Sequence, residues 1–153
     1  RVLFFSLFTL TSYLLSAQSV TIYHCDIPPT DSLPCLNNSF DSHYLKPVGT
    51  KKVGTRTDTL WSVDIYASLV FTNYPYDTPV EFILYRNEAW TDKQGEYHSK
   101  NVQIDSATVR KQKDWNFIWR KFTIKQEGSF WINAYINGDL IASGLVNTEK
   151  RKR

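Results

Sequence analysis

Short runs in which apolar and polar side chains alternate are the feature that most constrains the fold of this 153-residue chain. The longest run covers residues 61–71, where the apolar positions are two residues apart. Its apolar members are Trp61, Val63, Ile65, Ala67, Leu69 and Phe71. A period of two places these side chains on one face of a β-strand, whereas helical periodicity is scarce throughout the chain. The pattern therefore predicts an all-β fold.

Shorter runs predict further strands, separated by turns rich in Gly, Pro, Asn and Asp. These runs cover residues 20–24, 80–85, 102–109, 117–124, 130–136 and 140–146. The run at 117–124 changes parity between Trp119 and Phe122, which predicts a β-bulge. Residues 87–100 are mostly polar and are expected to form a loop.

The dipeptide Asn137-Gly138 is the strongest turn signal, because a two-residue hairpin turn of this kind requires positive φ at both positions. With Gly128-Ser129-Phe130-Trp131 before it, this hairpin resembles the closing hairpin of immunoglobulin-like and fibronectin-type domains. The resemblance extends in outline over residues 59–147. It implies an antiparallel, immunoglobulin-like β-sandwich of about seven strands. It implies no functional residues, and the inter-sheet cysteine pair of antibody domains is absent from this sequence.

The N-terminus has the character of a secretory signal peptide. Arg1 precedes an apolar stretch that ends at Leu15, and residues 2–23 contain no charged side chain. This stretch of about 14 residues is too short for a transmembrane helix, which needs roughly 20. The small residues of Ala17-Gln18-Ser19 predict that residues 1–19 are removed and that the protein is secreted without a stable membrane anchor. An uncleaved anchor and a buried first strand are the alternatives.

Secretion places the two cysteines in an oxidising compartment. Cys25 and Cys35 are ten positions apart in a proline-rich segment, so we predict a disulfide bond between them. A pair of free thiols and a metal site are the alternatives. Both cysteines lie in residues 25–58, an N-terminal loop segment with one short candidate strand at 46–53. The triplet Asn37-Asn38-Ser39 predicts a glycan on Asn37 if the host is a eukaryote.

The net charge of +3 is concentrated near the C-terminus. Four basic residues end the chain: Lys150, Arg151, Lys152 and Arg153. Without them and Arg1, 13 of the 18 basic residues remain against 15 acidic ones, which argues against nucleic-acid binding. A smaller basic run comprises Lys46, Lys51, Lys52 and Arg56. We expect a single domain over residues 20–147. The tail, residues 148–153, is expected to be a solvated end, a processing site or a contact for anionic surfaces.

Motifs of the common enzyme classes are absent from the sequence. No Gly-x-Ser-x-Gly elbow, His-Glu-x-x-His pair, phosphate-binding loop or dinucleotide fingerprint occurs. The three histidines, His24, His43 and His98, are expected to be surface or loop residues. No catalytic residue, metal or cofactor is predicted. Glycoside hydrolysis needs only two carboxylates, and the 15 acidic residues keep that chemistry open.

Binding is the function that the sequence favours. Two polar segments carry aromatic side chains, with Tyr74 and Tyr76 in the first and Trp90 and Tyr97 in the second. Exposed Tyr and Trp side chains anchor many protein interfaces and also stack on sugars. We therefore predict a secreted binding or adhesion module that recognises an extracellular protein or glycan. The alternative is a carbohydrate-active enzyme or its sugar-binding accessory domain.

Overall fold

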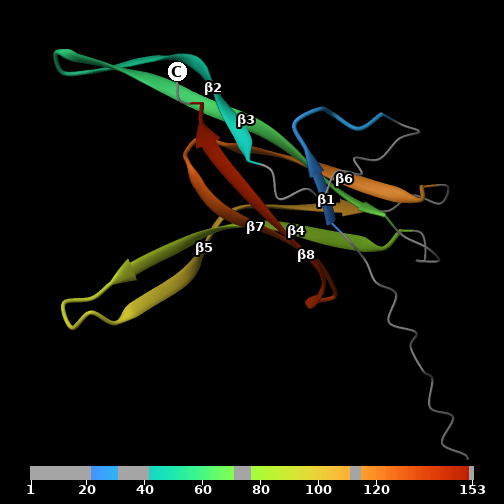
Figure 1. The fold of residues 1–153 in the computed structure, drawn as a ribbon. Coiled ribbons are helices and arrows are strands. Elements are labelled where there is room, and N and C mark those ends of the chain that lie inside the picture. The colour runs from blue at the N-terminus through green and yellow to red at the C-terminus, as the bar shows by residue number, and fades with distance from the viewer. Residues whose placement is uncertain (1–21, 31–41, 71–76, 111–114, 152–153) are drawn as a thin grey trace, which may run out of the picture.

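The all-β prediction is confirmed. The computed structural model describes residues 22–30, 42–70, 77–110 and 115–151. These residues form eight strands and no helix (Figure 1). The strands are β1 (Ile22–Cys25), β2 (His43–Val53), β3 (Arg56–Val70), β4 (Pro79–Thr91), β5 (Tyr97–Arg110), β6 (Phe117–Ile124), β7 (Gly128–Ile136) and β8 (Asp139–Lys150).

The eight strands form one mixed sheet. Its order is β1-β3-β2-β8-β7-β4-β5, and β6 pairs with β3 outside this path. Every pair is antiparallel except β2 and β8, which run parallel from His43 opposite Thr148 to Leu45 opposite Lys150. The predicted purely antiparallel arrangement is therefore wrong at this pair. Because β2 and β8 are distant in the sequence, no hairpin turn dictates their relative direction.

Strand β3 connects β2 with β1 and β6, because it pairs with all three strands. Its first half, Arg56–Ser62, pairs with β2. Its second half, Val63–Val70, pairs with β6, and Tyr66–Leu69 also pair with β1. The buried side chains of this half form one core cluster with those of β4, β7 and β8. The largest fully buried side chains of the core are Phe82, Phe122 and Phe130.

The pairing of β6 corrects a prediction. Its eight residues pair with β3 without a register shift, so the expected bulge is wrong. Ile118 and Phe122 lie on the core face of β6, while Trp119 lies on the outer face with its ring edge-on to Tyr66. The apolar pattern appeared to change parity because Phe117 and Trp119 are large apolar residues on the outer face. Phe117 is buried even though it belongs to that face. Size and hydrophobicity alone do not distinguish the two faces here.

The closing hairpin is confirmed at the predicted turn. Asn137 and Gly138 have φ angles of 53° and 87°, and they join β7 to β8. Strand β8 continues to Lys150, so the first three residues of the expected tail belong to the sheet. Lys152 and Arg153 lie outside the described residues.

Two hairpins extend beyond the core. Strand β2 pairs with β8 only up to Leu45, so residues 49–60 pair only within their own hairpin, which we name the basic arm. Strand β4 pairs with β7 only up to Arg86, and residues 87–101 form a second two-stranded hairpin, which we name the aromatic arm. From the tip of the basic arm the chain runs along β3 to the opposite end of the fold. It returns along β4 to the tip of the aromatic arm. Both tips therefore lie at one end of the fold, on the left in Figure 1.

Several predicted features lie outside the described residues. They are the signal peptide at 1–19, Cys35, Asn37, Tyr74 and Tyr76. Cys25 ends β1 and is not a free thiol, but its pairing with Cys35 stays a prediction. No helix of the described part is long and apolar enough to cross a membrane.

Two histidines are buried, although both were expected on the surface or in loops. His24 of β1 is 3% exposed and His43 of β2 is 9% exposed. His24 Nδ1 lies 2.8 Å from His43 Nε2, so one imidazole donates a hydrogen bond to the other. Burial, followed by repulsion from His43, lowers the pKa of His24 below its ordinary value, while a backbone hydrogen bond at Leu145 acts in the opposite direction. The lowered pKa favours the uncharged form of His24, and the hydrogen bond between the two rings joins β1 to β2.

The lowered pKa of His24 predicts that acidification destabilises the fold. The folded state holds fewer protons than the unfolded state once the pH falls below 6.5, the unperturbed pKa of histidine. The free energy of unfolding should be highest above that pH and should fall below it, by up to about 1.4 kcal/mol per pH unit for one proton. Urea denaturation between pH 5 and 8 measures this slope. The His24→Gln variant should have a flatter profile, and an unchanged profile would contradict the assignment.

The core predicts a large effect at Phe82. This side chain is fully buried in the core cluster, so Phe82→Ala should lower the free energy of unfolding by about 3–5 kcal/mol. Leu140 is 55% exposed, so Leu140→Ala should change it by less than about 0.5 kcal/mol. Urea denaturation compares the two variants. Similar losses in both would show that the core is misassigned.

Candidate functional site

The aromatic arm replaces the loop that was expected at residues 87–100. Strand β4 continues to Thr91 and β5 begins at Tyr97, so only residues 92–96 form the turn. Asp92 fixes this turn, because its Oδ1 accepts the backbone N–H groups of Gln94 at 3.0 Å and Glu96 at 2.8 Å. Gly95 has a φ of 86°, which suits glycine in a tight turn. Cross-strand pairing thus extends through a segment whose polarity resembled that of a loop.

One face of the aromatic arm carries a continuous row of interacting side chains. Trp90 and His98 are directly opposite each other, and their rings stack with centroids 5.4 Å apart and an interplanar angle of 22°. Lys100 Nζ lies 5.8 Å from the centroid of the Trp90 ring and 3.3 Å from Glu88. Glu88 also pairs with Arg86 at the base of the arm. Such cross-strand contacts stabilise an arm that has no sheet neighbour.

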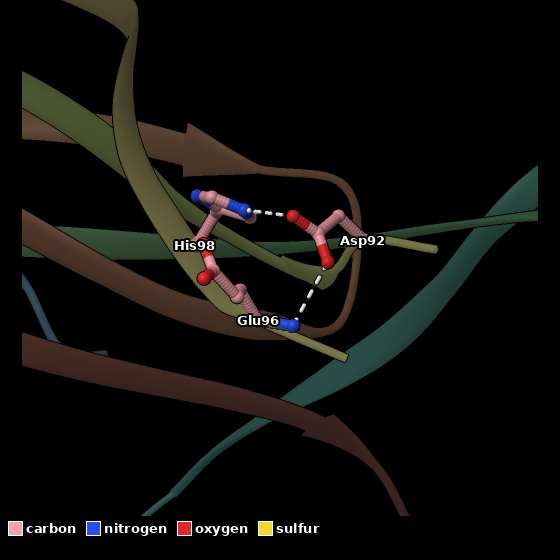
Figure 2. Close-up of side chains that lie close together, drawn as sticks. All are labelled: Asp92, Glu96 and His98. Atoms are coloured by element: carbon pink, nitrogen blue, oxygen red, sulfur yellow. Dashed lines mark hydrogen bonds and ion pairs between the residues drawn. The ribbon is translucent and has the colours of Figure 1, made fainter. Parts of the chain in front are cut away.

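The row ends at the tip in a cluster of three ionisable side chains, Asp92, Glu96 and His98 (Figure 2). His98 Nε2 lies 2.8 Å from Asp92 Oδ2, and one donor atom from each of the three side chains lies within 4.8 Å of the others. The hydrogen bond from His98, and then the backbone N–H groups of the turn, lower the pKa of Asp92. Asp92 therefore carries its negative charge at neutral pH.

The two predicted aromatic anchors of this segment face opposite ways. Trp90 is 46% exposed and pairs with His98 on the row described above. Tyr97 is 69% exposed and pairs with Thr91 on the other face, since neighbouring residues of a strand alternate in direction. The arm therefore presents one aromatic side chain on each face. The predicted residues Tyr74 and Tyr76 lie outside the described part of the chain.

The turn between β6 and β7 lies beside the β2–β3 and β4–β5 hairpins. Lys125 and Gln126 line a groove of about 580 Å³ with Leu60 and Trp61 of the β2–β3 hairpin. The same two residues also line a second groove together with Ile104 of β5. This turn therefore lies beside both hairpins, next to Leu60 of the basic arm and to Ile104 in the part of β5 outside the aromatic arm.

Comparison with known protein families, curated proteins and solved structures finds no match for this chain. The chemistry of the site therefore rests on its own geometry.

Sequence reasoning missed Asp92 and Glu96 as members of the site. The spacing of Asp92, Glu96 and His98 gives no helical or alternating pattern, and Asp near Gly is most often only a turn signal. Their convergence depends on the five-residue turn at 92–96, which reverses the chain so that His98 returns beside Asp92. An indication in the sequence was the clustering of His and acidic residues around Gly95.

The geometry of the aromatic arm predicts a small stability effect at Trp90. Trp90→Ala removes a half-exposed side chain, its ring stack and a cation contact, so the free energy of unfolding should fall by about 1 kcal/mol or less. Urea denaturation measures this change, with Phe82→Ala as the reference for a core position. A loss comparable to that of Phe82→Ala would place Trp90 in the core and remove it from the candidate site.

Proposed function

We propose that this chain is a secreted β-sandwich of immunoglobulin-like type that acts as an extracellular binding module through its two arms. The observation that carries the proposal is the pair of hairpins that project from one end of the fold (Figure 1). Both hairpins carry large exposed side chains. These side chains are Val53 and Leu60 on the basic arm and Trp90 and Tyr97 on the aromatic arm. Val48 lies at the base of the basic arm and is also exposed.

Each arm is a two-stranded hairpin whose folding costs conformational entropy that no neighbouring strand of the described sheet offsets. A two-stranded hairpin is marginally stable alone, and ordering its backbone costs roughly 1–2 kcal/mol per residue. Contacts within the aromatic arm, such as the ring stack and ion pairs, offset part of this cost. Exposed Trp, Tyr and Leu side chains remain, and these gain free energy when a partner covers them. An arm of this kind is best explained by contact with another molecule.

Basic residues of the C-terminal segment lie near the base of the basic arm, close to Lys46 of β2. Lys150 lies opposite Leu45 in the parallel β2–β8 pair, which brings the C-terminal tail beside Lys46. Lys150 Nζ lies 5.6 Å from the Trp61 ring centroid, and the Arg151 guanidinium lies 5.4 Å from that of Tyr44. This convergence supports an anionic contact surface on the partner. In this proposal Lys150 and Arg151 contact the same partner surface as the basic arm.

A protein partner fits this surface better than a sugar. One face of the Trp90 indole is stacked against His98, and Lys100 lies near the same ring, so these contacts already occupy part of the ring surface on which a sugar would stack. Aliphatic side chains such as Val53 and Leu60 bury well against protein side chains. We therefore propose an extracellular protein as the partner, and glycan binding is the alternative outcome of the test.

The remaining parts of the proposal concern processing. Residues 1–19 act as the signal peptide, Cys25 pairs with Cys35, and Asn37 carries a glycan in a eukaryotic host. The absence of a free thiol at Cys25 supports the pairing. Intact mass measurement of the secreted protein, before and after reduction, tests all three together. A mature chain that begins at Arg1 would contradict secretion.

The arms predict the effect of substitution on binding. The double variant Trp90→Ala/Tyr97→Ala should weaken binding to extracellular proteins of the natural host at least tenfold, because interface Trp and Tyr often contribute 2 kcal/mol or more each. Crosslinking of the tagged secreted protein, followed by mass spectrometry and titration of the captured partner, gives the measurement.

A matched control is available on the body of the fold. Trp119 is 41% exposed on the outer face of β6, so Trp119→Ala removes a similar area away from the arms. Binding should be unchanged in this variant. Equal losses in both variants would contradict recognition through the arms, and capture of glycans without proteins would reverse the preferred partner class.

A further inference from the structure

The geometry points to a metal site at the tip of the aromatic arm, where Asp92, Glu96 and His98 bind a divalent transition-metal ion of the Zn²⁺ type. One carboxylate oxygen from each acid and one imidazole nitrogen lie within 4.8 Å of one another (Figure 2). Donors bound to a common Zn²⁺ ion at about 2.1 Å lie about 3.4 Å apart in a tetrahedral site. Rotation of exposed side chains closes the remaining gap without a change in the backbone.

The donor set selects the kind of ion. One imidazole nitrogen with two carboxylates suits zinc, copper and nickel ions, which bind nitrogen well. Ca²⁺ prefers six to eight oxygen donors, and Mg²⁺ prefers an octahedron of oxygens with several waters. The imidazole thus separates this cluster from an ordinary acidic surface patch. The two carboxylates balance the charge of the bound dication.

Contacts outside the cluster hold His98 in place. Its ring stacks on Trp90 at a centroid distance of 5.4 Å, so its orientation does not depend on Asp92 alone. Trp90 is itself held by the cross-strand pairing of the arm. This support resembles the outer-shell contacts that orient metal-binding histidines in general.

The acidic ligand next to His98 is also held before any ion binds. Asp92 uses Oδ1 for the two backbone N–H groups of the turn, which leaves Oδ2 directed at His98 Nε2. Binding replaces the hydrogen bond between Oδ2 and Nε2 with two metal–ligand bonds: the Nε2 proton leaves to solvent, and the metal-bound neutral imidazole carries its single proton on Nδ1. Two of the three ligands are thus arranged in advance, which lowers the entropy cost of binding.

Three protein ligands leave at least one coordination position of the ion open. In a four-coordinate Zn²⁺ site that position takes water or a donor from another molecule. The tip is at the end of the arm and the three side chains are at least partly exposed, so a second molecule can reach the ion. The site itself requires only this chain and does not depend on the proposed binding function.

Calorimetric titration of ZnCl₂ into the metal-free full chain, in a buffer that does not chelate, tests the site. We expect one ion per chain. His98→Ala and Glu96→Gln should each lower the affinity at least tenfold, whereas Lys93→Ala in the same turn should leave it within twofold. Urea denaturation confirms that each variant is folded. Absence of binding, or an unchanged affinity in either ligand variant, would overturn the assignment.

Trp90 provides a second readout that locates the ion. Cu²⁺ quenches the fluorescence of a nearby indole, so CuCl₂ titration should quench part of the emission with the same one-to-one end point. In Trp90→Phe an aromatic ring that can stack on His98 is kept, and most of this quenching should disappear. Quenching that persists in Trp90→Phe would place the ion near another of the five tryptophans and overturn the site at the tip.

Discussion

The pairing of β3 with three different strands is the constraint on which the rest of the structure depends. Its first half belongs with β2, and its second half lies between β1 and β6. One strand of fifteen residues thus fixes the position of the core face and the direction of the projecting hairpin. Val63, Ile65, Ala67 and Leu69 place one face of this strand in the core. A shift of one residue would turn these side chains to the other face, so the register is strongly specified.

The two arms form because strands β2 to β5 continue beyond their buried residues. Strand β4 buries Val80, Phe82, Ile83 and Leu84, and β7 pairs with it only as far as Arg86. Beyond that point the strand continues because cross-strand contacts and the Asp92 turn replace burial as the source of order. The side chains that stabilise the arm are therefore also the side chains that it exposes. This coincidence links the stability of the arm to its proposed binding role.

Tertiary pairing also brings distant polar groups together. His24 and His43 meet because β1 and β2 both lie beside β3, and their hydrogen bond requires at least one unprotonated ring nitrogen as the acceptor. Lys150 meets the basic run of β2 through the parallel pair with β8. At the aromatic tip the distance in sequence is small, but the hairpin turn decides which donor atoms converge. In each case the chemistry depends on neighbours that sequence spacing does not give.

The sequence by itself determined the strand class, the core face of β3 and the closing turn at Asn137-Gly138, because alternation and positive φ are local requirements. It also identified Trp90 and Tyr97 as exposed aromatic residues. It did not determine the length of β4 and β5, since polar cross-strand pairs give no apolar alternation. Only the tertiary structure decided that β2 and β8 run parallel, that Ile118 shares the core face of β6 with Phe122, and that Asp92, Glu96 and His98 share one tip. These outcomes depend on which strands become neighbours, and that choice is made by burial of the whole core and not by any single segment.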